Sequence, residues 1–301
     1  MKTQLANLDR HTPSRAIALP RLTLASVGLF LLRAVQYGLL ILLALVMLTP
    51  FMWMLSTSLK TQEYILQSKP QLIPNPISFD SYTELFDIMP VGRMLLNSAV
   101  VAVVGTAGQV LMAAMAAYAF ARMQWRGRQA VFLLYLATMM IPSQVTIIPL
   151  FILVRKLGWM NTYQALIVPS LFSAFATFLL RQSFMTIPRD LEEAAFIDGG
   201  NHFTVFRRIV LPLSGPVLAT LSVFGFMALW NSYLWPLFVA REQEIMTLPV
   251  GLAALQGSNQ SLTEWNLVMA GAVITVLPIL VVYLLAQRWF VQGVVLSGIK
   301  A

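Results

Sequence analysis

The stretch EEAAFIDGGNHFTVFRRIVLP, residues 192–212, stands out because it is polar within a largely apolar chain. It contains three acidic residues, two arginines, a histidine and the pair Gly199-Gly200. Of the 301 residues, 58% are hydrophobic and only 11% are charged, whereas about 25% of residues in soluble domains are charged. With a mean hydropathy of +0.75, the composition predicts an integral membrane protein in which residues 192–212 lie outside the lipid.

Six windows on either side of this stretch contain no Asp, Glu, Lys, Arg or His, and each is long enough to cross a bilayer, which takes about 20 apolar residues. They are 34–59, 94–121, 129–154, 157–180, 209–240 and 265–287. The membrane part of the fifth window is expected to begin near Pro216. Five prolines predict kinks, which a bundle tolerates when neighbouring helices satisfy the freed carbonyls: Pro50, Pro142, Pro149, Pro169 and Pro278.

Six crossings place both termini on the same side of the membrane. The segments expected on that side carry 14 of the Lys and Arg residues and the opposite loops carry 6, so the positive-inside rule predicts that both termini are cytoplasmic. The net charge of +8 then reflects basic loops and not nucleic-acid binding. The predicted organisation is a multi-pass protein of the cytoplasmic (inner) membrane, with an N-terminal tail 1–33, a six-helix domain 34–290 that includes the loop 181–212, and a C-terminal tail 291–301. The apolar run 22–32 predicts an interfacial helix or an extension of the first span.

The polar stretch itself predicts two short helices. Asp190 can act as N-cap with Glu193 completing a capping box, and Gly199-Gly200 ends the first helix because glycine accepts the left-handed conformation. A second helix begins near Phe203, and Pro212 marks the return to the bilayer. From periodicity alone, an ordinary amphipathic interfacial loop remains possible.

The spacing of the residues in the stretch 192–212 resembles that of a known sequence motif. Glu193-Ala194-Ala195, Gly199, Ile209 and Leu211-Pro212 resemble the EAA motif of ABC importer permeases. The segments YAFARMQWRGR (118–128), MIPSQVTIIPLF (140–151), WNSYLWPL (230–237), EWNLVMAGAVITVLP (264–278) and QRWFVQG (287–293) are similar to the carbohydrate-uptake branch of that family, of the maltose and glycerol-3-phosphate type. The resemblance implies an all-α membrane protein with six transmembrane helices, the type I ABC importer permease fold, and a cytoplasmic coupling helix.

The family resemblance also implies a set of partners. The coupling helix would dock into a cleft on a cytoplasmic ATPase subunit, where small alanines allow close approach and Glu193 offers a carboxylate. A second homologous permease, two ATPase subunits and an extracytoplasmic solute-binding protein complete the assembly, and ATP and Mg²⁺ are held by the ATPase subunits, with no cofactor on this chain. The loop 241–264 is expected to contact the binding protein, and the C-terminal tail the ATPase. The implied coupling residues are Glu192, Glu193, Ala194, Ala195, Phe196, Asp198, Gly199 and Phe203.

The residues themselves argue against a self-powered carrier and against an enzyme. The sequence has no G-x-x-x-x-G-K-[ST] phosphate loop. No charged side chain stands in the middle of a window, where secondary carriers place coupling groups. Cysteine is absent and the two histidines, His11 and His202, are far apart. The acidic cluster at 190–198 is the only candidate for catalysis, and its fit to a helix start makes catalytic residues unexpected.

Neutral polar and aromatic residues in the windows suit an uncharged polyhydroxyl solute such as a sugar. The same residues also have structural roles, because amides tie transmembrane helices together and Trp and Tyr mark the membrane interface. A solute-lining role and a structural role therefore both stay open. Gln109 fits the role of joining two helices. A glycerophosphate or amino-sugar solute is the alternative, and a phosphate would favour extra basic residues, which the windows lack. The predicted substrate-pathway residues are Asn231, Tyr233, Trp235, Trp230 and Asn97.

Overall fold

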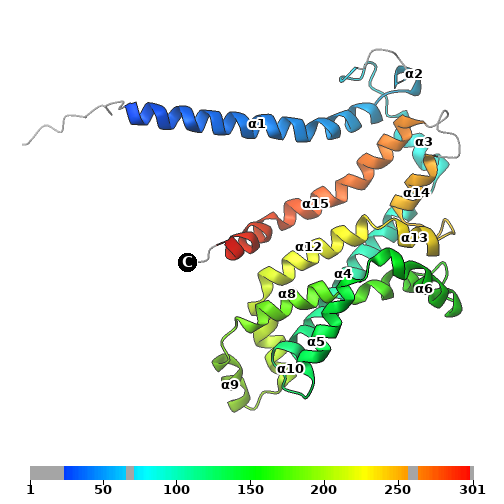
Figure 1. The fold of residues 1–301 in the computed structure, drawn as a ribbon. Helices are drawn as coiled ribbons and strands as arrows, with labels where there is room; N and C mark the ends of the chain where they lie inside the picture. The colour runs from blue at the N-terminus through cyan, green and yellow to red at the C-terminus, as the bar shows by residue number, and fades with distance from the viewer. Residues whose placement is uncertain (1–23, 66–70, 257–263, 299–301) are drawn as a thin grey trace, which may run out of the picture. The chain divides into compact units, whose positions relative to one another are not determined.

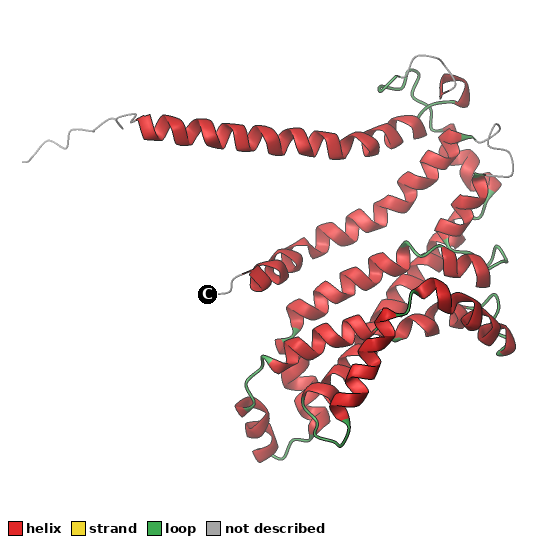
Figure 2. Cartoon of the chain, viewed as in Figure 1, coloured by secondary structure: helices red, strands yellow, loops and turns green. Residues whose placement is uncertain are grey.

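The structure is a computed structural model that describes residues 24–65, 71–256 and 264–298. Within these ranges the chain forms helices joined by short loops, without a strand (Figure 2). The all-α fold class predicted from the sequence is therefore confirmed. The chain divides into two compact units, Met1–Met52 and Trp53–Ala301.

Most of the first long helix, α1 (Leu24–Ser58), belongs to the first unit. It begins before residue 34, so the part of the apolar run 22–32 that the structure describes extends the first span and does not form a separate interfacial helix. Pro50 lies inside the continuous helix. Every side chain from Leu31 to Met52 is exposed, and apolar side chains exposed on all sides of a helix fit a lipid or subunit environment.

The second unit is built around α4 (Val91–Ala121), which packs against α8 (Ala174–Met185) and α12 (Gly215–Trp230). Helix α12 packs in turn against α15 (Trp265–Gly298), so these helices lie side by side in Figure 1. The remaining elements are α2 (Gln62–Ile65), α3 (Asp80–Ile88), α5 (Arg128–Ala137), η1 (Thr138–Met140), α6 (Ser143–Lys156), α7 (Tyr163–Ile167), η2 (Val168–Leu171), α9 (Asp190–Ile197), α10 (His202–Val205), the π-helical η3 (Phe206–Val210), α11 (Leu211–Leu213), α13 (Leu234–Val239) and α14 (Leu248–Leu255).

The described part of the chain has three helices that are long and apolar enough to cross a membrane by themselves, and six crossings if each of three bent helix pairs counts as one. The continuous spans are Leu31–Ser58, Val91–Ala121 and Trp265–Gln287. The bent pairs are Arg128–Met140 with Ser143–Lys156 at 100°, Tyr163–Leu171 with Ala174–Met185 at 42°, and His202–Leu213 with Gly215–Trp230 at 79°.

The bends correct the expectation of long, kinked spans. The window 129–154 is not one straight helix, because the chain turns by 100° at the break that contains Pro142. Proline cannot donate the helical hydrogen bond and clashes with the preceding turn, and here the helix stops before it. Pro149 and Pro278 lie inside continuous helices instead. The position of a proline alone therefore did not predict which helices break.

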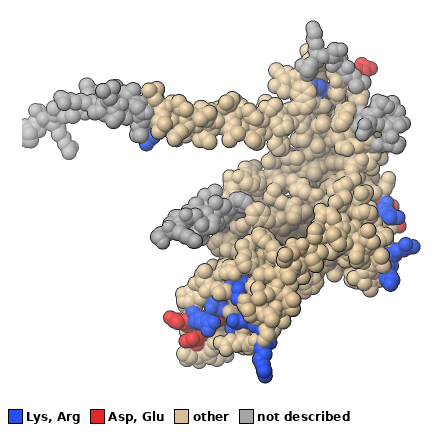
Figure 3. Space-filling model, viewed as in Figure 1, with Lys and Arg blue, Asp and Glu red and all other residues tan. Residues whose placement is uncertain are grey.

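The polar segments of the second unit gather at two ends. At the first, which we name the α9 end, the loop after α4 meets α9 through Arg122 and Glu192. At the other, the α14 end, Arg93 Nε donates to the Glu244 carbonyl at 3.0 Å and Asn161 Nδ2 to Glu242 Oε1 at 2.8 Å. This grouping matches the one predicted from the loop charges. Figure 3 shows acidic and basic side chains gathered at the α9 end and a band without charged side chains beside it.

Small residues allow the central helices to approach closely. Ala113, Ala114, Ala117 and Ala121 of α4 are buried in the core cluster near the α9 end, together with Leu180 and Phe184 of α8. On α12, a methyl group added at Gly225 would lie 2.9 Å from Gln109 Oε1. Because lipid tails are as apolar as leucine, close packing of small residues is the main source of helix association in a bilayer.

Enlarging one of these alanines should loosen the bundle. Ala117 is fully buried, so Ala117→Leu should cost about 1–3 kcal/mol through overpacking and lower the midpoint of thermal unfolding of the detergent-purified protein. Ala107→Leu, at an exposed position of the same helix, serves as the control and should leave the midpoint unchanged. Equal midpoints for the two variants would contradict the packing described for α4.

Candidate functional site

Helix α9 projects from the α9 end between α8 and α10 (Figure 1). Its first turn contains Asp190, Glu192 and Glu193, where the helix dipole favours negative charge. The predicted capping box is wrong: Arg189 is the N-cap residue, no side chain caps the helix, and Asp190 is already helical. Glu192 occupies the third helical position from which a capping carboxylate would reach back, but it lies against Arg122 instead.

Helix α9 ends just before Gly199 and Gly200, as the sequence predicted. Gly199 has a φ of +83°, the left-handed region that favours glycine. Its N–H donates to the Phe196 carbonyl at 3.0 Å, and the N–H of Gly200 donates to the Ala195 carbonyl at 2.8 Å. These two bonds form a Schellman motif, which satisfies carbonyls left open at the helix end and turns the chain sharply into α10.

The second half of the polar stretch is a short helical segment that leads into the bundle. The side chain of Asn201 caps α10 by accepting from the Thr204 N–H at 2.9 Å. Val205, Phe206 and Val210 are buried, whereas Arg207 and Arg208 are exposed, so the segment has an apolar and a polar side. The segment from His202 to Leu213 then meets α12 at 79°.

The side chains of the stretch divide into an inward and an outward set. Glu192 is buried and Ala195 is half-buried. Ile197 is 86% exposed and Phe203 65% exposed, although both are large and apolar. The outward set comprises Leu191, Glu193, Ala194, Phe196, Ile197, Asp198, Gly199 and Phe203. Large apolar side chains exposed among charged ones at a polar end are typical of a protein interaction surface.

Arg122, which the sequence analysis did not single out, forms the base of this site. Its Nε lies 2.9 Å from Glu192 Oε1, with only 4% and 9% of the two side chains exposed. Its Nη2 donates to the Ile187 carbonyl at 2.6 Å and also to the Phe184 carbonyl, which closes the end of α8. We call this set of contacts the Arg122 junction. Arg122 lies within one of the stretches that resemble the permease family, but nothing local in the sequence links it to Glu192.

A second contact holds the loop after α9. The hydroxyl of Tyr118, on α4, lies 3.2 Å from Nδ1 of His202. The rings of His202 and Phe196 meet edge to face, with centroids 5.1 Å apart. Tyr118 also packs edge to face against Phe206 at 5.4 Å. The stretch that follows Gly199 is thereby fixed to the same helix, α4, that provides Arg122.

Two of the five predicted pathway residues are buried and bonded to other segments of the chain. Asn97 is fully buried: its amide donates to the carbonyls of Glu244 and Met246, both at 2.9 Å, and accepts from the Tyr163 hydroxyl at 2.7 Å. The indole of Trp230 is buried and donates to the Thr275 carbonyl at 3.1 Å.

The other three pathway residues lie around the start of α13. Trp235 is half-buried and its indole donates to the Ala165 carbonyl at 2.8 Å. Asn231 and Tyr233 are exposed, and Asn231 uses its amide nitrogen to close its own helix, donating to the Met227 carbonyl at 2.8 Å. Of the five predicted residues, Asn231 and Tyr233 therefore have the most surface available to a solute.

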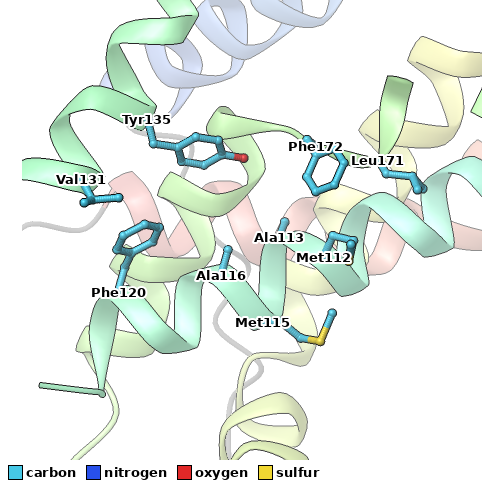
Figure 4. Close-up of a pocket in the computed structure, with 9 residues that line it drawn as sticks. All are labelled: Met112, Ala113, Met115, Ala116, Phe120, Val131, Tyr135, Leu171 and Phe172. Carbon is cyan, nitrogen blue, oxygen red and sulfur yellow. The ribbon is translucent and has the colours of Figure 1, made fainter. Parts of the chain in front are cut away.

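A cavity of about 350 Å³ lies beside α4, α5 and η2 (Figure 4). It is lined by Met112, Ala113, Met115, Ala116, Phe120, Val131, Tyr135, Leu171 and Phe172. This lining is apolar apart from the Tyr135 hydroxyl, which lies 3.5 Å from Thr177 Oγ1. A sugar needs several hydrogen-bonding groups to replace its hydration, so this cavity is not a sugar site.

Among residues 24–65, 71–256 and 264–298, no group of three or more His, Asp or Glu side chains is arranged to hold a metal ion. The acidic residues at the start of α9 do not form such a group either. They lie in the first turn of α9, and Glu192 among them is paired with Arg122.

Comparison with known proteins places this geometry in a family. The chain is 38% identical to the sn-glycerol-3-phosphate transport system permease protein of Pectobacterium atrosepticum, over 80% of this chain and 87% of that protein. It is 33% identical to the arabinooligosaccharides transport system permease protein of Halalkalibacterium halodurans, over 86% of this chain and 93% of that protein.

A solved structure agrees with the sequence relatives. The fold matches that of a bacterial ABC transporter involved in the import of the acidic polysaccharide alginate, with a TM-score of 0.78 and 25% identity over 90% of this chain and all of that chain. The type I ABC importer permease fold predicted from the EAA spacing is thereby confirmed. Residues 109–296 match the family model described as "Binding-protein-dependent transport system inner membrane component", and this multi-pass membrane chain belongs to that family of transport permeases.

Proposed function

We propose that this chain is one of two permease subunits of an ATP-driven importer for a sugar or sugar-like solute, and that α9 is its coupling helix. A second homologous permease, two ATPase subunits and an extracytoplasmic solute-binding protein would complete the assembly. ATP and Mg²⁺ would be held by the ATPase subunits, since this sequence has no phosphate-binding loop. The relatives named as permeases of transport systems support this assignment.

The observation that carries the proposal is the outward surface of α9 together with Phe203, which follows the helix. Ile197 and Phe203 present apolar side chains to water at an end that also displays Glu193 and Asp198. An apolar centre with a charged rim is the usual composition of a protein interface. A cleft on an ATPase subunit would cover the apolar pair and offer basic groups to the acidic residues.

The charge distribution supports a cytoplasmic position for this surface. The loop after α4 and the segment around α9 meet at the α9 end, and together they carry seven of the Lys and Arg residues. By the positive-inside rule this end would face the cytoplasm, and with six crossings both termini would lie on that side as well. The α14 end would then face the binding protein, and Asn97 and Arg93 hold its loop by bonding the Glu244 carbonyl.

The mechanism follows from these positions. Closure of the ATPase subunits on ATP would move the two coupling helices, and each would carry the helices attached to it. The spans would thereby alternate between arrangements open to the two sides, which is a rigid-body switch biased by a partner. This chain contributes contacts and positions, and the chemistry of ATP hydrolysis would occur on the partner.

The solute proposal rests on the neutrality of the bundle. In α4, α8, α12 and the part of α15 up to Gln287, the charged residues are Arg93, near the start of α4, and Arg181, near the end of α8. Amide and aromatic groups such as Asn231 and Tyr233 pair with hydroxyls and stack on sugar rings, so an uncharged saccharide fits better than a phosphate. The relative named for glycerol 3-phosphate supports glycerophosphate as the alternative solute, and competition between a neutral oligosaccharide and glycerol 3-phosphate for uptake decides between them.

A single charged substitution on the outward surface of α9 tests the proposed contact with the ATPase. Ile197→Asp should remove most of the ATPase subunit from the detergent-purified complex, because a carboxylate cannot enter an apolar contact without a large desolvation cost. Co-purification of the ATPase with the permease measures the effect. Ile73→Asp, at a similarly exposed apolar position in the segment before α3, is the matched control and should retain the ATPase. Retention of the ATPase by Ile197→Asp would refute the proposed surface.

The left-handed turn after α9 provides a second test. Gly199→Val forces a β-branched residue to a φ of +83°, at a cost of about 1–2 kcal/mol or more, and should reduce uptake severely by misdirecting α9. Asparagine tolerates this conformation, so Gly199→Asn should keep a substantial part of the uptake. Solute uptake into proteoliposomes measures both variants, and the assignment would be lost if valine were tolerated as well as asparagine.

The two amide residues are expected to behave differently. Asn231→Leu should change the KM or rate of solute uptake while the complex assembles normally, because among the described residues the exposed amide bonds only its own helix. Asn97→Leu should instead reduce assembly, since it removes the partner of the Met246 carbonyl and of the Tyr163 hydroxyl and leaves the Glu244 carbonyl with Arg93 alone, at about 1–3 kcal/mol for each group left buried and unpaired. Uptake kinetics and the yield of the assembled complex separate the two effects. Unaltered kinetics for Asn231→Leu would remove it from the pathway.

A further inference from the structure

Two adjacent glutamates at the start of α9 point in different directions, and the difference separates two roles. Glu193 is exposed and available to a partner. Glu192 is buried, and its carboxylate lies against Arg122. A buried carboxylate cannot contact another protein, so its charge must serve an interaction within this chain. This changes the role predicted for Glu192, which was grouped with the residues that touch the ATPase.

We propose that Arg122 and Glu192 are positioning residues that make α4, α8 and α9 move as one body, so that displacement of the coupling helix reaches two membrane helices directly. The proposal rests on the function proposed above, because it concerns a chain whose α9 is moved by a partner. Without such a connection α9 is joined to the bundle only by the short segments on either side of it, which could bend and absorb the movement.

The geometry of the guanidinium group explains why an arginine occupies this position. Arg122 follows the last residue of α4. From there it reaches the carboxylate of α9 and two carbonyls at the end of α8, those of Phe184 and Ile187. Arginine offers five donors in a fixed plane, whereas lysine offers a single charged point. One side chain thus connects three helices, and it also places a positive charge where the dipole of α8 is negative.

Burial makes this connection resistant to loosening. An exposed ion pair contributes little and exchanges freely with water. Removing one partner of a buried pair leaves the other charge without compensation, which is strongly unfavourable. With so little of either side chain exposed, the separated state of the Arg122 junction is expected to be rarely populated, so α9 cannot swing away from α4 while the bundle stays folded.

The contact between Tyr118 and His202 gives α9 a second point of attachment to α4. His202 follows the Schellman turn and packs on Phe196 of α9. The helix is therefore fixed near its start through Glu192 and near its end through Phe196 and His202, in both cases to α4. Because α9 is attached at two points, it cannot rotate about either one. It can therefore pass a displacement on to α4 without turning in place.

The test replaces Glu192 in the full complex reconstituted in proteoliposomes with its binding protein. Glu192→Gln keeps the size of the side chain and removes its charge, so ATP hydrolysis should continue while uptake per ATP hydrolysed falls about tenfold or more, given the cost of breaking a buried pair. Arg126→Gln removes a positive charge from the same loop at an exposed position and should leave this ratio unchanged. Parental uptake per ATP in Glu192→Gln would overturn the proposal.

A distance measurement gives a readout that a general loss of stability would not reproduce. The chain has no cysteine, so Met123→Cys and Arg189→Cys, both at exposed positions, place two spin labels on the segments that follow α4 and precede α9. In the otherwise parental complex the separation of the labels should be the same with and without ATP. With Glu192→Gln added, the distance distribution should broaden or shift on ATP binding. A separation that changes with ATP in the parental complex would show that α4 and α9 do not move together.

The outcomes also distinguish this proposal from the function on which it rests. If the parental complex shows no ATP-dependent uptake, the proposed function fails; if it transports and Glu192→Gln transports equally well, the junction alone fails. If Glu192→Gln does not assemble, Arg122→Lys decides, because lysine keeps the charge and loses the planar set of donors. Uptake per ATP should then fall, and a parental ratio in Arg122→Lys would contradict the proposal.

Discussion

The organisation of the α9 end depends on a buried guanidinium group. Arg122 is placed where α4 leaves the bundle; its guanidinium forms an ion pair with the carboxylate of Glu192, and its Nη2 donates to two carbonyls at the end of α8. These contacts explain why a short helix of eight residues, which would be marginal on its own in water, can project from the bundle and still keep a defined direction. They also free the outward surface of α9, with Ile197 and Glu193, for another protein.

The lipid environment accounts for most of the remaining architecture. Helices that cannot rely on the hydrophobic effect for their association pack through small residues, as on the buried face of α4, and through amides such as Asn97 whose partners lie within the chain. Charged residues collect at the two ends. The neutral band between the ends suits an uncharged solute and a transporter whose energy comes from a partner, which agrees with the family to which the chain belongs.

The features that the sequence predicted well are local. A glycine pair after an apolar and acidic run predicts a helix end, and the bonds around Gly199 and Gly200 have that form. Hydropathy and loop charges identified the apolar segments and grouped the loops by end. The pairing of Arg122 with Glu192 could not be predicted, because it depends on how distant segments pack. A kink was expected at Pro142, but its size of 100° was not. The burial of Asn97 and Trp230 could not be predicted either, since composition does not distinguish an amide that faces a solute from one that joins two segments of the chain.

The most direct test of the central claim is the accessibility of one thiol. In the cysteine-free chain, Ile197→Cys provides a single reactive group on the outward surface of α9. A membrane-impermeant maleimide should label it in inside-out vesicles that lack the ATPase subunits, should leave it unlabelled in right-side-out vesicles, and should lose access when the ATPase subunits are bound. Labelling from the outer face, or labelling that the ATPase does not reduce, would contradict the account.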